Sequence, residues 1–185
     1  MVKLKFEDLT IEIYDDPAFS SGSADNSRNY LKHYFGDGAL EHPGARHGIK
    51  ILDNDIEINN CIVIGSGGVT GVIEHSVLLD GDKILVCCCN TLFCLSVPCL
   101  ELHWQTKVDW ATCFEVFKLD NDYLVHGELQ ISRIDSSGNI KWQFQGQDIW
   151  VSLGDKNPFN ITPDFIQLFD FCNKAYKIDF NGELL

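Results

Sequence analysis

Hydrophobic and polar residues alternate with a period of two through much of the chain after residue 48. The clearest run comprises residues 113–119, 123–128, 129–135 and 140–145, with turns rich in Asp, Asn and Gly after the first and third segments. Alternation places every second side chain on one face of a β-strand, and these turn residues tolerate the backbone angles of tight hairpins. The pattern predicts a four-stranded antiparallel meander.

The same unit recurs along the chain. The fourth segment of each copy begins at an aliphatic residue after a turn, with spacings of 46, 38 and 44 residues between Ile56, Leu102, Ile140 and Leu184. Trp104 and Trp142 are equivalent in this alignment, so we expect both indole rings to pack between adjacent units. The spacing is close to the ~40–45 residues of a four-stranded propeller blade. We predict an all-β fold of antiparallel four-stranded meanders arranged as a small or incomplete β-propeller.

The N-terminal part has a different pattern. Residues 4–14 alternate and predict one or two strands, residues 30–35 suggest a short helical turn, and the segments around them have loop composition. We expect a single domain over residues 1–185, in which residues 1–47 form an N-terminal strand and long loop and residues 48–185 form about four repeat units. Because the last copy stops before its tryptophan position, we expect residues 4–14 to supply the missing strand of the last sheet.

Residues 129–144 read Leu-Gln-Ile-Ser-Arg-Ile-Asp-Ser-Ser-Gly-Asn-Ile-Lys-Trp-Gln-Phe. This segment resembles the PQQ-like and related β-propeller repeats, whose blades carry a strand, an Asp-x-x-Gly turn and a strand with a hydrophobic-x-Trp motif. The resemblance extends loosely over residues 48–185 and implies a propeller architecture, and no cofactor is carried over from it. The chain departs from the family pattern in having four units at most and Ile58 at the first tryptophan position.

The charge balance limits what the chain can bind. Lys and Arg number 14 against 27 Asp and Glu, which gives a formal net charge of −13. Nucleic-acid binding relies on a surplus of Lys and Arg at the phosphates, so we expect no nucleic-acid partner. An acidic surface favours association with a basic protein partner. In general character, a short acidic repeat protein also resembles the immunity proteins of toxin systems.

Eight cysteines occur without a Cys-x-x-Cys pair, and Cys87, Cys88 and Cys89 are consecutive in an apolar run. Such cysteines behave as small core residues, and free thiols at this density are typical of a reducing compartment. No continuous apolar segment resembles a signal peptide or a membrane span. We expect a cytoplasmic location, no membrane partner and no disulfide framework.

Two motifs suggest a bound cofactor or metal. The Gly-rich residues 65–71 follow an apolar segment, as in a dinucleotide-binding loop, but Thr70 occupies the third glycine position and a strand-like segment follows. His33, His42 and His47 lie in a loop-rich region, and their spacing fits no rigid metal site. We therefore assign no cofactor-binding residue, no metal-ligating residue and no cofactor.

Several residues could serve acid–base or nucleophilic catalysis. They are Glu74 with His75, His126 with Glu128, and either Cys61 or Cys113. Their spacing selects none of them, so we assign no catalytic residue and favour a protein that is not an enzyme.

Two pairs of acidic and aromatic residues in the connections between units form the candidate partner site. Asp109 aligns with Asp148, 39 residues later, and Trp110 and Trp150 follow them. Loops on one face of a repeat array commonly form its binding surface, and aromatic residues are frequent in interaction hot spots. The alternative is that the aspartates cap turns and the tryptophans are buried.

Three functions stay open on this basis. The leading hypothesis is a non-catalytic protein-binding module, such as an immunity-type protein that neutralises a basic partner. The second is an enzyme that processes a small molecule or carbohydrate at the central propeller face, which requires convergent carboxylates or histidines in a cleft. The third is a structural subunit that oligomerises through open sheet edges.

Overall fold

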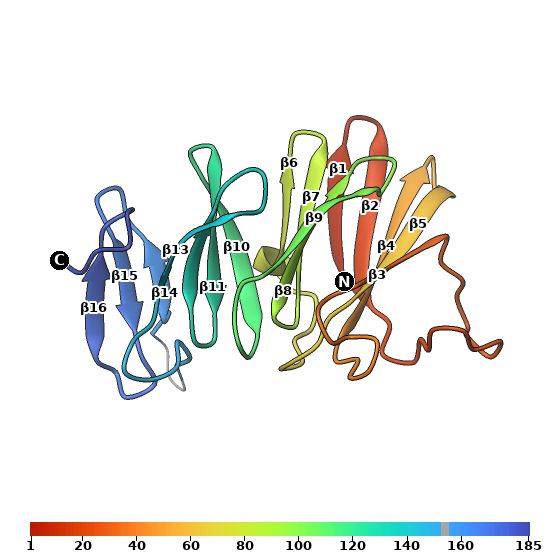
Figure 1. The fold of residues 1–185 in the computed structure, drawn as a ribbon. Coiled ribbons are helices and arrows are strands. Elements are labelled where there is room, and N and C mark those ends of the chain that lie inside the picture. Colours follow the sequence, from red (N-terminus) through yellow and green to blue (C-terminus); the bar gives the residue numbers. More distant parts are fainter. Residues whose placement is uncertain (153–155) are drawn as a thin grey trace.

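The computed structural model describes residues 1–152 and 156–185, and within them the chain forms sixteen β-strands and one 3₁₀ turn, η1 (Glu74–Ser76). The strands make four sheets that follow one another along the chain and stand in a row (Figure 1). This arrangement confirms the predicted all-β fold of four-stranded meanders in an incomplete β-propeller. Within the same described part, no helix has the length and apolarity needed to cross a bilayer.

Sheet A has five strands in the order β1-β2-β4-β5-β3. Their bounds are β1 (Val2–Phe6), β2 (Leu9–Asp15), β3 (Lys32–Phe35), β4 (Arg46–Asp53) and β5 (Ile56–Ile64). The expectation that residues 4–14 complete the last sheet is wrong, because β1 forms a hairpin with β2 and β2 pairs with β4 along its whole length. The expected helical turn at residues 30–35 is also wrong. β3 pairs parallel to β5, and its Tyr34 and Phe35 pack on opposite faces of the sheet.

Sheets B, C and D repeat the meander in chain order. Sheet B comprises β6 (Val77–Asp80), β7 (Lys83–Cys88), β8 (Thr91–Ser96) and β9 (Leu102–Lys107). Sheet C comprises β10 (Cys113–Leu119), β11 (Asp122–Gly127), β12 (Ile131–Ile134) and β13 (Ile140–Phe144). Sheet D comprises β14 (Phe159–Ile161), β15 (Ile166–Phe169) and β16 (Ala175–Ile178). Ile56, Leu102 and Ile140 each begin the fourth strand of a meander, and Leu184 bridges to Ile178 at the equivalent place in sheet D. The predicted repeat is confirmed.

Consecutive sheets share their hydrophobic cores. In sheet B, Phe93 faces the core shared with sheet A, and its neighbour Leu92 faces the core shared with sheet C. In sheet C, Val125 faces sheet B and Leu124 faces sheet D. All four side chains are at most 1% exposed. Sheets B and C therefore have two buried faces, and β7 and β8 accordingly contain continuous apolar runs, Ile84 to Cys88 and Leu92 to Leu95.

The two ends of the row differ. On the outer face of sheet A, Phe19 and Tyr30 from the long segment between β2 and β4 pack against Ile62. On sheet D, Asn160, Ala175 and Lys177 alternate with buried positions and are exposed. Sheet A is therefore covered on both faces, whereas sheet D buries one.

A tryptophan joins sheet B to a turn of sheet C. The indole N–H of Trp104 in β9 donates a hydrogen bond to the carbonyl of Ser136 (3.1 Å). The ring lies against Gly138, whose φ is +88°, a conformation that glycine adopts without strain. The side chain of Asp135 shapes the same turn by accepting hydrogen bonds from the backbone N–H groups of Ser137 and Asn139.

The same tryptophan contact recurs between sheets C and D. Between sheets A and B a tyrosine makes a different contact in its place. Trp142 in β13 donates to the carbonyl of Phe180 (3.1 Å) and lies against Gly182 (φ +83°). The prediction that both tryptophans pack between adjacent units is confirmed. At the junction of sheets A and B, where the tryptophan is absent, the hydroxyl of Tyr34 donates to the carbonyl of Leu100 (2.8 Å).

We predict that Gly138→Ala destabilises the protein more than Gly81→Ala does. Both glycines have positive φ, but a Cβ at Gly138 would lie 2.6 Å from the Trp104 ring, and one at Gly81 would meet nothing within 4 Å. The shared backbone strain is ~1–2 kcal/mol, and the overlap at Gly138 adds ~1–3 kcal/mol. Urea unfolding measures both losses. Equal losses for the two variants would contradict the tryptophan contact.

Candidate functional site

The four residues predicted to bind a partner lie in different environments. Trp150 is fully buried and Asp109 is 2% exposed, whereas Trp110 is 70% exposed. Asp148 is half-buried, and the thiol of Cys172 donates a hydrogen bond to it. Asp109 and Trp150 are thus inaccessible to a partner, in agreement with the alternative of turn-capping aspartates and buried tryptophans. Trp110 and Asp148 stay predictions as contact residues.

Asp109 accepts four backbone hydrogen bonds. Its Oδ1 accepts from the N–H groups of Ala111 (2.6 Å) and Thr112 (3.1 Å), and its Oδ2 accepts from those of Leu129 and Gln130 (2.8 Å each). The carboxylate therefore fixes the connection from sheet B to sheet C against the turn between β11 and β12. This role is structural, since all four donors belong to the chain's own backbone.

The Gly-rich residues 65–71 have a packing role. A Cβ at Gly65 would overlap the carbonyl oxygen of Cys88, and one at Gly67 would overlap that of Ala111. These glycines let the connection from sheet A run closely across the turns of sheets B and C. The segment leads into the 3₁₀ turn η1 and then into strand β6. A dinucleotide-binding loop leads instead into a helix.

The three N-terminal histidines do not converge. His33 and His42 are exposed, while His47 is fully buried with its Nδ1 3.0 Å from Oδ1 of Asp15. Burial lowers the pKa of His47, against the opposing effect of the Asp15 charge. Within the part of the chain that the structure describes, no three His, Cys, Asp or Glu side chains are placed to hold a metal ion.

A pocket of about 290 Å³ lies beside the first strands of sheets C and D and is lined in part by His75, Glu115 and Phe159. Glu115 Oε2 lies 2.8 Å from His126 Nδ1, and the carbonyl of Trp150 lies 2.9 Å from Nε2 of the same ring. Phe159 stacks on His126 with the ring centroids 5.0 Å apart. Glu115 therefore holds a buried histidine in place, and among the residues that the structure describes no second carboxylate lines this pocket.

Burial also changes the pKa of the cysteines that the sequence offers as candidate nucleophiles. It raises the pKa of the Cys61 and Cys113 thiols, which removes the thiolate that nucleophilic catalysis needs. All eight cysteines fall within the described residues, and each is a free thiol.

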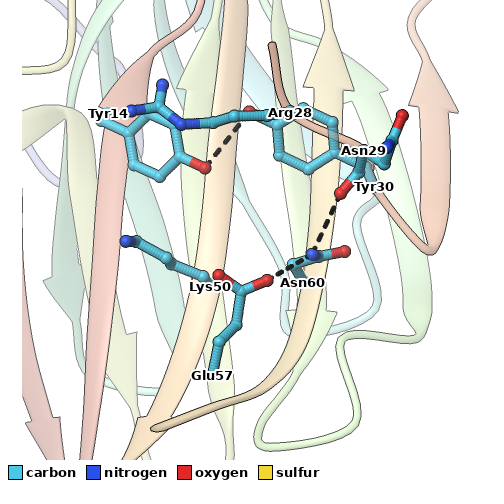
Figure 2. Close-up of a pocket in the computed structure, with 7 residues that line it drawn as sticks. All are labelled: Tyr14, Arg28, Asn29, Tyr30, Lys50, Glu57 and Asn60. Carbon is cyan, nitrogen blue, oxygen red and sulfur yellow. Dashed lines mark hydrogen bonds between the residues drawn. The ribbon is translucent and has the colours of Figure 1, made fainter. Parts of the chain in front are cut away.

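Figure 2 shows a polar pocket of about 190 Å³ on the outer face of sheet A. The guanidinium of Arg28 lies over the Tyr14 ring, 4.7 Å from its centroid. Lys50, on the other side of the pocket, pairs with Glu12 at 3.0 Å. Burial raises the pKa of the Tyr30 hydroxyl, so this group is not an acid or base near neutral pH. Each charged group of the pocket therefore has a partner of its own: Arg28 lies over Tyr14, Lys50 pairs with Glu12, and Glu57 accepts a hydrogen bond from Asn60.

The most distinctive surface is a long edge of the row of sheets, where one set of hairpin turns lies. The hairpin turns that define this surface lie at the same end of the strands, along the upper edge of the row in Figure 1. They are the turns β1–β2, β4–β5, β6–β7, β8–β9, β10–β11, β12–β13 and β14–β15, and the turn that follows β16. We call this edge the acidic rim and define it by eight exposed carboxylates in or beside these turns: Glu7, Asp8, Asp53, Asp55, Asp82, Asp120, Asp164 and Glu183. Among the described residues, none of the eight forms an ion pair.

Other carboxylates at the same end are held by cations. Lys118 pairs with Asp80, and its hydrogen bond lowers the pKa of that carboxyl. Arg133 and Lys141 both pair with Asp122. Burial raises the pKa of Asp122, but the hydrogen bonds from the two cations outweigh it and the net shift is downward. The cations at this end therefore pair with Asp80, Asp122 and the exposed Glu101, and the eight rim carboxylates lie outside these pairs.

Asp109→Ala should destabilise the folded state by about 3 kcal/mol or more, because it leaves four backbone N–H groups without an acceptor and each buried one costs ~1–3 kcal/mol. Asp148→Ala is the control and should cost under about 1 kcal/mol, since its carboxylate is partly solvated. Thermal and urea unfolding give both values. A stable Asp109→Ala protein that loses only partner binding would show that Asp109 is a contact residue.

Comparison with known proteins identifies no family for this chain. No protein-family model matches it, and no curated protein matches it. Similar solved structures include the AfRom2 CNH domain (TM-score 0.48, 13% identity, 76% of this chain and 46% of that chain). They also include the N-terminal domain of Nup159 (TM-score 0.45, 13% identity, 100% of this chain and 51% of that chain). The chain thus spans about half the length of these structures.

Proposed function

We propose that this chain is a non-catalytic protein-binding module that binds a basic protein through the acidic rim. The observation that carries the proposal is the set of eight exposed carboxylates without ion pairs at one end of the sheets. The net charge of −13 adds a long-range field of the same sign.

Two hairpin turns at the same end of the sheets are held by their own aspartates, and the second of them contains Glu183 of the rim. Asp135 and Asp179 each accept hydrogen bonds from backbone N–H groups within their own turns. These bonds lower the pKa of both carboxyls, chiefly through Asn139 for Asp135 and through the backbone N–H of Glu183 for Asp179. A preorganised charged surface loses little conformational entropy on binding and speeds the encounter with an oppositely charged partner.

An immunity-type role is the finer form of this proposal. A toxin with a basic surface is one partner that an acidic rim would suit, because electrostatic complementarity gives fast and oriented association. The exposed Trp110, with Lys107 Nζ 4.4 Å from its ring centroid, offers an aromatic contact outside the rim. The enzyme alternative receives less support, because Glu115 is bound to His126 and no second acid among the described residues lines its pocket.

The rim is tested by neutralising four of its charges together in the variant Glu7→Gln/Asp8→Asn/Asp53→Asn/Asp55→Asn. The probe is lysozyme, a small basic protein, and calorimetry at 50 mM and 200 mM salt gives its Kd. Surface charges contribute ~0.2–1 kcal/mol each, so we expect the variant to bind about tenfold more weakly at low salt and the difference to shrink at high salt.

The matched control removes four exposed carboxylates outside the rim, Asp25, Asp37, Glu41 and Glu74. Its net charge changes by the same amount, so it measures the effect of total charge alone. We expect it to weaken lysozyme binding less than the rim variant does. Equal weakening by both variants, or binding that salt does not change, would overturn the rim as the binding surface.

A further inference from the structure

Two consecutive cysteines occupy the turn between β7 and β8. Cys88 ends β7, and Cys89 follows with a φ of +53°. Consecutive strand residues normally point to opposite faces, and Cys87 and Cys88 do so, since they belong to different core clusters. The left-handed conformation of Cys89 breaks the alternation, so Cys88 and Cys89 both lie in the core between sheets A and B. Two adjacent thiols are thereby placed on the same side of the chain.

The two thiols have complementary surroundings. The sulfur of Cys89 accepts a hydrogen bond from the backbone N–H of Ala45 (3.0 Å), whereas the thiol of Cys88 donates to the carbonyl of Ala45 (3.4 Å). The neighbouring Cys88 thiol, the Ala45 N–H and the charge of Arg46 lower the pKa of Cys89 to about 7, although burial opposes them. Burial raises the pKa of Cys88. One member of the pair is thus partly ionised at neutral pH, and its neighbour carries a proton.

The cover over Cys89 is thin. A Cβ at Gly44 would lie 2.7 Å from the Cys89 sulfur, and a Cβ at Gly65 would lie 2.7 Å from the Cys89 Cβ. The backbones of Gly44 and Gly65 therefore pack directly against the fully buried Cys89 side chain. A pocket of about 250 Å³ borders the segment Gly44, Ala45 and Arg46 from outside. This segment is the part of the cover over Cys89 that lies next to a pocket.

We propose that Cys88 and Cys89 form a dithiol site that reacts with hydroperoxides. The Cys89 thiolate attacks the terminal peroxide oxygen and the O–O bond breaks, which forms sulfenic acid on Cys89. Hydroxide leaves from hydrogen peroxide, and the alkoxide leaves from an organic hydroperoxide. The Cys88 sulfur then attacks the Cys89 sulfur, its proton goes to the departing oxygen, and water leaves. The peroxide is the oxidant, and the product is a Cys88–Cys89 disulfide that a dithiol reductant restores.

The other thiols differ from this pair in burial and reactivity, and these differences determine the design of the test. Cys113 is buried with a raised pKa, and Cys87 shares its core cluster between sheets B and C. Cys99 and Cys172 are exposed and would react with added reagents. The parent protein for the test is therefore the double variant Cys99→Ser/Cys172→Ser, which retains six buried cysteines.

The folded parent is treated with hydrogen peroxide at pH 7, denatured, and alkylated, and its free thiols are counted by mass spectrometry. We expect the count to fall from six to four. Trypsin cuts after Lys83 and Lys107, so a Cys88–Cys89 disulfide removes two hydrogens from one peptide, whereas a Cys87–Cys113 disulfide joins two peptides. This readout needs no further variant to fold.

Two variants then assign the roles of the cysteines. Cys88→Ala should stop at a sulfenic acid that dimedone labels on Cys89, and Cys89→Ala should retain all its thiols. Circular dichroism confirms that each variant is folded before treatment. Six free thiols in the treated parent, a cross-linked pair of peptides, or loss of two thiols in Cys89→Ala would each overturn the proposal.

Discussion

Burial between consecutive sheets is the constraint on which the rest of the structure depends. Sheets B and C bury both faces. Leu92 and Phe93 point to opposite faces of sheet B, and Leu124 and Val125 do so in sheet C, so each sheet needs a neighbour on both sides. A sheet with two apolar faces is not stable alone in water, because either face would expose a large hydrophobic area. The sheets therefore stabilise one another as nearest neighbours, as the units of repeat proteins do.

Polar contacts set how the sheets align. Trp104 and Trp142 each hold a turn of the following sheet, and Asp109 holds the connection between sheets B and C. These contacts place the hairpin turns of successive sheets at one end of the row. Hairpin turns favour Asp, and the eight rim carboxylates lie in or beside these turns. Repetition of the hairpin therefore brings negative charge to that end of the sheets.

The sequence pattern predicted the regular part of this fold well, because the information there is local. β10 has the bounds that the alternation predicts, and the two tryptophans have the predicted role. The N-terminal part was misplaced because β2 and β4 pair across some thirty residues and β3 joins β5 in parallel. No local period reports such long-range pairing.

The candidate site was harder to predict than the fold. In the sequence, Asp109 with Trp110 and Asp148 with Trp150 are similar pairs of an acidic and an aromatic residue. Trp110 is nevertheless exposed and Trp150 is buried. Burial of a loop residue depends on which sheet packs over it, and spacing contains no such information. Cys88 and Cys89 were predicted as core residues, which is correct. The left-handed turn that brings them together depends on one φ angle that the alternating pattern does not encode.

Native-state hydrogen exchange, resolved by strand, tests the nearest-neighbour account most directly. Sheets B and C are packed on both faces and sheet D on one, so the amides of β7, β8 and β11 should exchange only through global unfolding. Those of β15 and β16 should exchange faster, through local opening of the last sheet. Equal protection of sheets B, C and D, or faster exchange in sheet B than in sheet D, would contradict the account.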